Sequence, residues 1–287
     1  MDNPLDHTGK VVLVTGGTRG IGRTIAAQYT AAGASVVVCG RTPPDAASPQ
    51  HRATDAHEAQ SQAEREHHRT PSTEGNDGSV GATPPIFVRC DVREADQVAP
   101  LVAAVVERLG RLDVVVNNAG GGPYVDTTTA SPTLSEAVIR LNLLGPLFVA
   151  QAANRVMQDQ EAGGVIVNIA SVSATRPTPG TAAYGAAKAG LLSLTQTLAV
   201  EWAPKVRVNA VVAGIVQTDD TYEIYGNDAT LARMAATVPL GRLGTPADVA
   251  GACLYLSSPL AAYVSGAALT LHGGGERPAY LSAFESR

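Results

Sequence analysis

The sequence has few lysines and no excess of positive charge. Its 21 basic residues comprise 18 arginines and three lysines, against 26 acidic residues, and the formal net charge is −5. A mildly acidic chain gives no reason to expect nucleic acid or an anionic membrane surface as a partner. We therefore expect neither as a partner and look for a small-molecule site. The scarcity of lysine also makes a lysine within an apolar segment worth explaining.

Cysteines and long apolar runs are scarce as well. Cys39, Cys90 and Cys253 lie far apart and form no CxxC pair, which argues against a disulfide framework and against a zinc site. The first ten residues, MDNPLDHTGK, lack the apolar core of a signal peptide. No unbroken apolar run reaches the roughly 18 residues of a membrane span. We expect a cytoplasmic protein.

Short β-branched segments alternate with segments rich in alanine and leucine. Apolar strands between helices are typical of a parallel sheet covered on both faces, and right-handed crossovers make such a sheet doubly wound. We predict a single α/β domain over residues 1–287, a three-layer Rossmann fold. The expected strands are 10–17, 35–40, 86–91, 112–120 with its loop, 164–171, 206–214 and 267–274, and the expected helices are 20–33, 94–110, 132–157, 182–202 and 246–256.

The connection between the second and third strands, residues 42–85, interrupts this pattern. It is rich in Pro, Ser, Thr, Gly and His and almost lacks large apolar residues, so we expect a flexible insertion. Residues 52–69 are its candidate crossover helix. Four histidines in the insertion raise the possibility of a metal site, but no Cys or carboxylate completes a ligand set and we favour a solvated surface segment. They are His51, His57, His67 and His68.

The segment TGGTRGIG, residues 15–22, joins the first expected strand to the first expected helix. Glycines allow a tight turn without side chains, and the N-terminus of the helix offers unpaired N–H groups and the positive end of its dipole. A pyrophosphate fits such a place. The position of these glycines between a buried strand and a helix predicts a dinucleotide-binding site.

The end of the second strand indicates which dinucleotide binds. An acidic residue there would bind the adenosine ribose and repel a 2′-phosphate, but this chain has Gly40 and then Arg41. Arg19, in the glycine loop, can reach the same place, and two guanidinium groups form a good phosphate clamp. We favour NADP(H) over NAD(H), with two ordinary surface arginines as the alternative. Asp91 is placed either to accept from an adenine amino group or to cap a helix.

Tyr184 and Lys188 stand one helical turn apart in the small-residue segment TAAYGAAKAG. Residues i and i+4 share a helix face, so both side chains should point into one cleft. The ammonium group should lower the pKa of the phenol from about 10, and such a tyrosine can exchange a proton with a carbonyl or alcohol oxygen. For a single pair of this kind, a half-buried tyrosine beside a solvated lysine is the ordinary explanation.

Two further polar residues strengthen the catalytic interpretation. Ser171 ends the strand before this helix, and its hydroxyl could polarise the same carbonyl group. Asn142 lies in an apolar helical segment, where a buried amide needs a partner. It could hold a water that passes protons to Lys188, or it could bond to the backbone.

In order and spacing, these segments resemble the short-chain dehydrogenase/reductase family over nearly the whole chain. The resemblance rests on TGGTRGIG, NNAG at 117–120, Asn142, Ser171, Tyr184 and Lys188. It implies hydride transfer between a nicotinamide and a carbonyl or alcohol. Tyr184 would be the general acid/base, Lys188 would hold the nicotinamide ribose, Ser171 would stabilise the substrate oxygen and Asn142 would support a proton relay. Cofactor contacts are expected from Gly16, Thr18, Arg19, Gly20, Ile21, Gly22, Arg41, Asp91, Val92, Asn118, Ala119, Gly120, Tyr184, Lys188, Gly214, Ile215 and Thr218.

The resemblance also implies a substrate lid at 218–244 and a homo-oligomer, a tetramer or dimer. We expect the lid to cover a mainly apolar pocket through Tyr222, Ile224, Tyr225, Leu231 and Met234, with Pro123, Tyr124 and Val125 as another wall. Where the family has Pro-Gly, this chain has Ala213-Gly214, and the loop loses the rigidity of proline.

Several substrates and functions remain open at this point. A ketone, a 3-oxoacyl group and a steroid-like alcohol all fit an NADP(H)-dependent ketoreductase. An NAD-dependent secondary alcohol dehydrogenase is the alternative enzyme. A sensor or scaffold that binds the cofactor without catalysis is the alternative outside enzymology, because fold does not imply activity.

Overall fold

The computed structural model describes residues 3–44, 83–218, 221–278 and 280. Contacts between residues divide the chain into Pro44–Ala82 and the remainder, Met1–Pro43 with Thr83–Arg287. The account below concerns the remainder. The expected insertion at 42–85, with its helix at 52–69 and its four histidines, lies almost wholly outside the described residues and stays a prediction.

Seven parallel strands form a single sheet in the order β3-β2-β1-β4-β5-β6-β7. From β1 the sheet grows through β2 and β3 on one side and through β4 to β7 on the other, which confirms the doubly wound arrangement. All seven expected strands are present, several of them shorter than expected. They are β1 (Val11–Thr15), β2 (Ser35–Gly40), β3 (Ile86–Arg89), β4 (Val114–Asn117), β5 (Gly164–Ser171), β6 (Val206–Ala213) and β7 (Ala268–Leu271).

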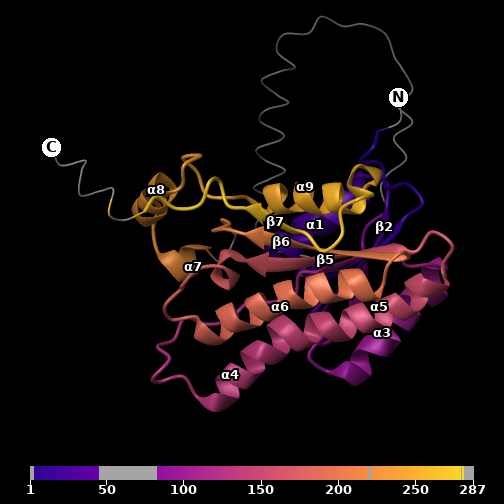
Figure 1. Ribbon diagram of the computed structural model, residues 1–287, viewed down its shortest axis with the longest axis horizontal. Helices are drawn as coiled ribbons and strands as arrows, with labels where there is room; N and C mark the ends of the chain where they lie inside the picture. Colours follow the sequence, from indigo (N-terminus) through magenta and orange to yellow (C-terminus); the bar gives the residue numbers. More distant parts are fainter. Residues whose placement is uncertain (1–2, 45–82, 219–220, 279, 281–287) are drawn as a thin grey trace, which may run out of the picture. The chain divides into compact units, whose positions relative to one another are not determined.

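Helices cover both faces of the sheet (Figure 1). Helices α1 (Gly20–Ala31) and α9 (Pro246–Ser257) lie side by side on one face, and α3 (Ala95–Leu109), α5 (Gly145–Asp159) and α6 (Ala182–Glu201) cover the other. The helix α4 (Pro132–Ile139) leads into α5 through the π-helical turn η1 (Arg140–Leu144). The remaining helical segments are η2 (Val172–Ala174), α7 (Thr221–Tyr225), α8 (Asp228–Thr237) and η3 (Pro259–Ala261).

The core follows from the alternation of side chains along the strands. Successive side chains of a strand point to opposite faces of the sheet. Val12 and Val14 of β1 therefore belong to the core with α1 and α9, whereas Val11 and Leu13 belong to the core with α3 and α5. Because both faces are covered, β1 is buried at every position.

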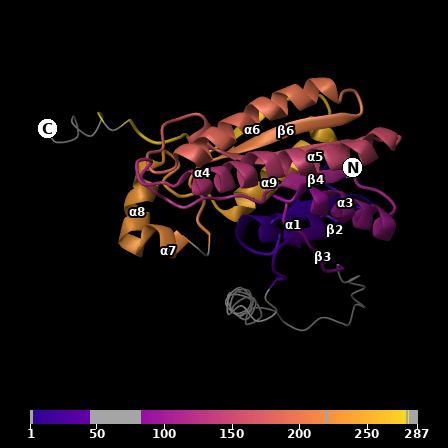
Figure 2. The same ribbon diagram turned by 90° about the horizontal axis from the view of Figure 1, so that it is seen from below.

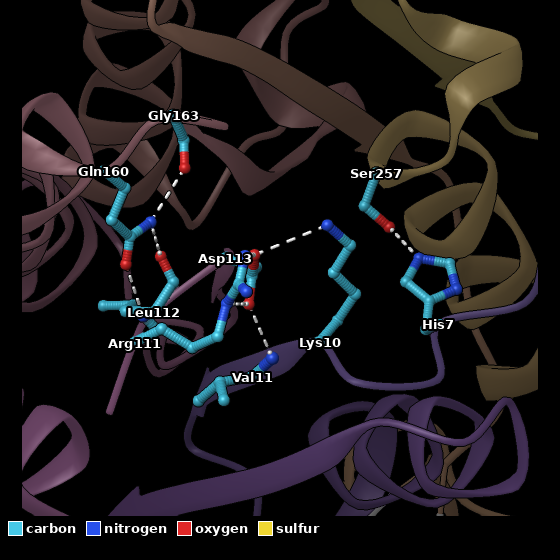
Figure 3. Close-up of polar contacts among 9 residues, drawn as sticks. All are labelled: His7, Lys10, Val11, Arg111, Leu112, Asp113, Gln160, Gly163 and Ser257. Carbon is cyan, nitrogen blue, oxygen red and sulfur yellow. Dashed lines mark hydrogen bonds and ion pairs between the residues drawn. The ribbon is translucent and has the colours of Figure 1, made fainter. Parts of the chain in front are cut away.

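A polar network fastens the amino ends of the central strands (Figure 3). The carboxylate of Asp113, just before β4, accepts from the backbone N–H of Val11 at 2.9 Å and from Nε of Arg111 at 2.8 Å. Gln160, after α5, accepts from Leu112 N at 2.8 Å and donates to Leu112 O at 2.9 Å. These side chains pair backbone groups that lie beyond the sheet ladder.

The continuous helical stretch Pro132–Asp159 is long and apolar enough to cross a membrane, with a mean hydropathy of 1.3 in its most apolar window. Helices that cover a sheet in a globular domain can be equally long and apolar. This stretch packs against α3, α6 and the sheet, which accounts for its apolar composition.

Candidate active site

The predicted site residues follow the carboxyl ends of β1 to β6. In an open α/β sheet, ligands bind outside these ends, where the strand order reverses. That reversal lies between β1 and β4. Figures 1 and 2 both show α7 and α8 beyond one end of the sheet, and α7 follows the carboxyl end of β6.

The glycine loop forms a turn that a cofactor phosphate would fit. Gly22 lies so close to Gly16 O and to Asn118 Nδ2 that a Cβ on Gly22 would overlap both atoms. Gly20 begins α1 with φ of 51°, and a Cβ there would meet nothing within 4 Å. The first turn of α1 therefore faces open space without a side chain in the way, as a pyrophosphate requires.

The NNAG segment is fastened beside this turn by Thr15. Thr15 Oγ1 accepts from the backbone N–H groups of Asn118 and Ala119, each at 3.0 Å, and Asn118 Nδ2 donates to Thr15 O at 3.0 Å. A Cβ on Gly120 would lie 2.8 Å from Asn142 Oδ1 and 3.1 Å from Lys188 Nζ. Glycine at 120 thus lets the backbone pass beside both groups. Thr15 was missed as a site residue, although its place at the start of TGGTRGIG was a usable signal.

On the adenosine side, Asp91 is held by Arg93. Arg93 donates to Asp91 Oδ1 from Nε at 2.9 Å and from its backbone N at 3.1 Å. Arg93, and more weakly the charge of Arg41, hold the pKa of Asp91 below its usual value. The helix-cap alternative is wrong, because Glu94 is the N-cap of α3. A contact of Asp91 with adenine stays a prediction.

The two arginines of the expected phosphate clamp lie at the surface of the protein. Arg19 is the N-cap residue of α1, and both Arg19 and Arg41 are exposed. Gly40 lies against Thr18, with 3.4 Å from a Cβ at position 40 to Thr18 Cγ2. The end of β2 and the glycine loop therefore meet, as the clamp requires.

Tyr184 lies in the first turn of α6 and Lys188 one turn later, as expected. Lys188 is 3% exposed, and its Nζ donates to Ile169 O at 2.7 Å. Desolvation lowers the pKa of Lys188 to about 8. Nζ lies 5.6 Å from the centroid of the Tyr184 ring.

The expectation that Lys188 lowers the pKa of Tyr184 needs correction. Burial raises the pKa of Tyr184, and the hydrogen bond with Ser171 opposes this only in part. Ser171 thus lies close enough to Tyr184 to influence its phenol, as the chemistry requires. In the protein without cofactor, desolvation of the phenol dominates over nearby charge.

Asn142 lies within the π-turn η1 and is fully buried. Its Oδ1 accepts from Gly121 N at 2.9 Å, and its Nδ2 donates to Gly121 O at 2.8 Å and to Val138 O at 2.9 Å. The amide of Asn142 therefore bonds to the backbone, which was the second of the two alternatives given above for this residue. Such π-turns occur frequently at functional sites, and this one places Oδ1 beside Gly120.

The loop after β6 is packed rather than loose. Gly214 N donates to Leu271 O at 2.8 Å, and a Cβ on Gly214 would lie 2.8 Å from His272 Cβ. Ile215 packs on the small apolar core of the lid. Thr218 lies before α7 and donates its N–H to Thr221 Oγ1.

Two cavities flank these residues. The smaller cavity is bordered by Tyr184 and by Pro123 and Val125, two of the three residues that were expected to form a wall of the substrate pocket. Tyr124 instead is 78% exposed, with its ring against Gly180. The larger, of about 340 Å³, is lined by Gly214 and Ile215 and by residues that no sequence pattern indicated, among them Arg242, Asp248, His272 and Glu276.

The lid differs from expectation in what its apolar side chains do. Leu231 is buried against Val238 and Leu243, and Met234 packs on the same cluster. Tyr222 is half exposed and donates its hydroxyl to Asp228 at 2.8 Å. The apolar residues of α8 thus stabilise the lid itself.

Comparisons with known proteins agree with this geometry. A family model described as "Enoyl-(Acyl carrier protein) reductase" matches residues 62–276, and one described as "short chain dehydrogenase" matches residues 10–68. The L-rhamnose 1-dehydrogenase (NAD(P)(+)) of Azotobacter vinelandii is 37% identical over 266 residues, 92% of this chain and 96% of that protein. The 3-oxoacyl-[acyl-carrier-protein] reductase of Synechocystis sp. is 36% identical over 271 residues, 93% and 97% of the two chains. The ligand-free aldohexose dehydrogenase of Thermoplasma acidophilum superposes with a TM-score of 0.77 at 27% identity, over 93% and 94% of the two chains.

Proposed function

The chain belongs to the short-chain dehydrogenase/reductase family, and we propose that within it the protein is an NADP(H)-dependent ketoreductase. As a member it is an oxidoreductase that uses a nicotinamide cofactor. The observation that carries the proposal is the pairing of Tyr184 with the buried Lys188 on α6, with Lys188 Nζ 5.6 Å from the centroid of the Tyr184 ring and Ser171 close to the phenol.

The protonation of Tyr184 suits the reductive direction. Burial raises the pKa of its phenol, so Tyr184 is neutral near pH 7 and is ready to give a proton to a carbonyl oxygen. Ser171 can donate a hydrogen bond to the same oxygen. The nicotinamide, when bound, supplies the hydride. Oxidation needs the phenolate instead, so it should require more alkaline conditions than reduction.

Lys188 serves as a fixed donor at the floor of the site. One of its N–H groups is bonded to Ile169 O, and its Nζ lies beside Gly120. The remaining donors can hold the hydroxyls of a nicotinamide ribose. Asn142 Oδ1 lies against the same glycine and is placed to accept from a water next to Lys188.

Arg19 and Arg41 support the choice of NADP(H). Two exposed guanidinium groups beside the Gly40–Thr18 contact match a 2′-phosphate, and the acidic residue that would repel it is absent from the end of β2. NAD(H) remains the alternative, since the relative from Azotobacter vinelandii is named for both cofactors.

The substrate is proposed to be a ketone, a 3-oxoacyl compound or a steroid-like molecule. The cavity beside Tyr184 is mainly apolar, and no charged side chain lines it within the described chain. We further propose a cytoplasmic homo-oligomer, a dimer or tetramer. Its three cysteines are buried free thiols, as suits a reducing compartment.

The proton-donor assignment is tested with Tyr184→Phe. The variant should lose at least about 100-fold in kcat for reduction of a ketone, the usual contribution of general acid catalysis. It should still bind NADPH, because the cofactor turn lies on other residues. Steady-state rates and fluorescence titration with NADPH measure the two effects. Near-normal turnover would show that the proton comes from elsewhere.

The cofactor assignment is tested with Arg41→Ala. Wild-type protein should bind NADPH more tightly than NADH, and the variant should lose about 10-fold in NADPH affinity while NADH changes little, because only NADPH carries the 2′-phosphate. Glu107→Gln, an exposed change on α3, is the control. Equal losses for both cofactors would remove the clamp argument and favour the NAD-dependent alternative.

A further inference from the structure

A chain of side-chain hydrogen bonds runs through the interior from α6 to β4. Asn168 of β5 donates from Nδ2 to Oγ1 of Thr195 on α6 at 2.9 Å. Asn117, the last residue of β4, donates from Nδ2 to Asn168 Oδ1 at 2.9 Å and to Pro146 O of α5 at 3.2 Å. Asn117, Asn168 and Thr195 are each 1% exposed. The chain therefore connects α6 to two central strands and to the start of α5.

The direction of these hydrogen bonds is set by Thr195. Its hydroxyl has one proton, which it donates to Leu191 O of its own helix at 2.8 Å, so its oxygen accepts from Asn168. Asn168 then turns its Oδ1 toward Asn117, and Asn117 presents its Nδ2. As a result, Asn117 Oδ1 is buried and has no hydrogen-bond partner among the described residues.

Stability alone does not account for this polar chain. A buried acceptor without a donor destabilises the folded state, whereas apolar side chains of similar shape at both ends of a hydrogen bond are often neutral or stabilising. Buried polar groups that persist in spite of this can select one packing arrangement over its neighbours. Here the arrangement in question is the place of α6 along β5.

The first half of α6 has few other features that would fix this place. Between Ala182 and Gly190, every residue is alanine or glycine except Tyr184 and Lys188. Detailed shape complementarity between side chains gives a core one well-defined arrangement. This half of the helix contributes small side chains, which interlock poorly with their neighbours.

Thr195 lies on the same face of α6 as the catalytic pair. It is seven residues, about two turns, beyond Lys188, and Tyr184 is one turn further toward the start of the helix. Both cross-links reach neighbouring residues of β5, because Lys188 Nζ donates to Ile169 O and Thr195 accepts from Asn168. The long flexible stem of a lysine can follow a small slide of the helix. The short side chain of Thr195 cannot, so its hydrogen bond is the more restrictive of the two.

We propose that Thr195 and Asn168 are positioning residues, which fix the place of α6 along β5 and with it the place of Tyr184. This inference rests on the proposed ketoreductase function. It concerns the distance of Tyr184 from Ser171 at the end of β5, not the proton transfer itself. A misplacement of about 1 Å can reduce a rate by about 100-fold, so a small slide of α6 should be visible in turnover.

The test removes the hydroxyl of Thr195 while keeping the shape of the side chain. Thr195→Val should lower kcat for reduction of ethyl acetoacetate with NADPH by about 10-fold or more, because Tyr184 loses its fixed place. The affinity for NADPH should change by less than about threefold, since the cofactor turn lies on β1 and α1. Thr195→Ser keeps the hydroxyl and should stay within about twofold of wild type in both quantities.

Thr30→Val on α1 is the matched control. Thr30 Oγ1 donates to Ala26 O at 3.0 Å, which is the same bond to the preceding turn that Thr195 makes. This variant should keep the kcat of wild type. A kcat of Thr195→Val within about twofold of wild type would overturn the proposal.

A double variant separates positioning from stability. Asn168→Leu with Thr195→Val replaces both ends of the hydrogen bond by apolar groups and leaves no Asn168 amide without its acceptor. Its melting temperature should therefore be at or above that of Thr195→Val, while its kcat should be equally low. Recovery of kcat together with the melting temperature would show that the Thr195 hydroxyl serves stability alone.

Hydrogen exchange separates this proposal from the proposed function. In the protein without cofactor, the backbone amides of 182–190 should exchange about 10-fold faster in Thr195→Val than in wild type, Thr195→Ser or Thr30→Val. This difference, with no turnover of ketone in any form, would support the fixing of α6 and refute the ketoreductase. Turnover in wild type, with exchange and kcat unchanged in Thr195→Val, would refute the positioning role and leave the ketoreductase standing.

Discussion

At the scale of single residues, desolvation sets the protonation of the site. Lys188 is enclosed by the end of β5 and by Gly120, and its Nζ donates a hydrogen bond to Ile169 O. A buried ammonium group without a carboxylate beside it is costly. The fold bears this cost at the position where a cofactor ribose would supply the missing acceptors. Strain of this kind is expected where function rather than stability has selected a residue.

The cost of burying Lys188 should appear as a pH dependence of stability. Its pKa falls from 10.5 in the unfolded chain to about 8 in the folded protein. Below about pH 8 both states are protonated and the folded state bears the full cost. Between about pH 8 and 10.5 only the unfolded state keeps the proton, so the contribution of Lys188 to the free energy of unfolding rises with pH, by about 3 kcal/mol in all.

Lys188→Met isolates this contribution. We expect the stability difference, wild type minus variant, to shift in favour of wild type by up to about 3 kcal/mol between pH 7 and pH 10. Urea unfolding without cofactor at the two pH values measures it. Lys205→Met provides the matched control for the effect of pH on the rest of the protein. A difference that stays constant with pH would mean that Lys188 is not desolvated in the free protein.

At the scale of elements, sequence periodicity predicts where helices lie but not how they are wound. The expected single helix over 132–157 is present as α4, η1 and α5. The apolar pattern of RLNLLGPL is continuous through the π-turn, so nothing in it marks the change. The change follows from the tertiary structure, because Asn142 has to reach both backbone groups of Gly121.

Ser171 and Tyr184 could be predicted because one stands at a strand end and the other at a helix start. Ser171 ends β5, and Tyr184 lies in the first turn of α6, so the doubly wound topology alone brings them to one edge of the sheet. The ion pair between Arg176 and Glu276, with 2.6 Å from Nη2 to Oε1, could not be predicted in this way. They are 100 residues apart and lie in loops, whose paths no periodicity determines. The packing of Leu231 inside the lid was missed for the same reason.

At the scale of the whole molecule, the two ends of the sheet have separate tasks. The carboxyl ends carry bare glycine turns, a buried lysine and cavities. The amino ends carry side-chain bonds that complete the pairing of backbone groups, centred on Asp113 and Gln160 (Figure 3). Parallel strands expose unpaired groups at both ends, and only the end that binds a ligand has reason to leave them unpaired.

This separation predicts that Asp113→Asn affects stability and leaves cofactor affinity unchanged. Asp113 is 4% exposed, and the substitution removes the charge that strengthens its bonds to Val11 N and to Arg111. Loss of these charge-assisted bonds should lower the free energy of unfolding by about 1–3 kcal/mol, whereas Asp159→Asn, at the exposed end of α5, should change it by less than about 0.5 kcal/mol.

Urea unfolding measures the stability of both variants, and fluorescence titration measures their NADPH affinity. The affinity of folded Asp113→Asn should stay within about twofold of wild type, because the residue lies at the opposite end of β4 from Asn118. A weaker affinity would show that the amino ends hold the carboxyl-end turns in place, and that the two ends of the sheet are coupled rather than independent.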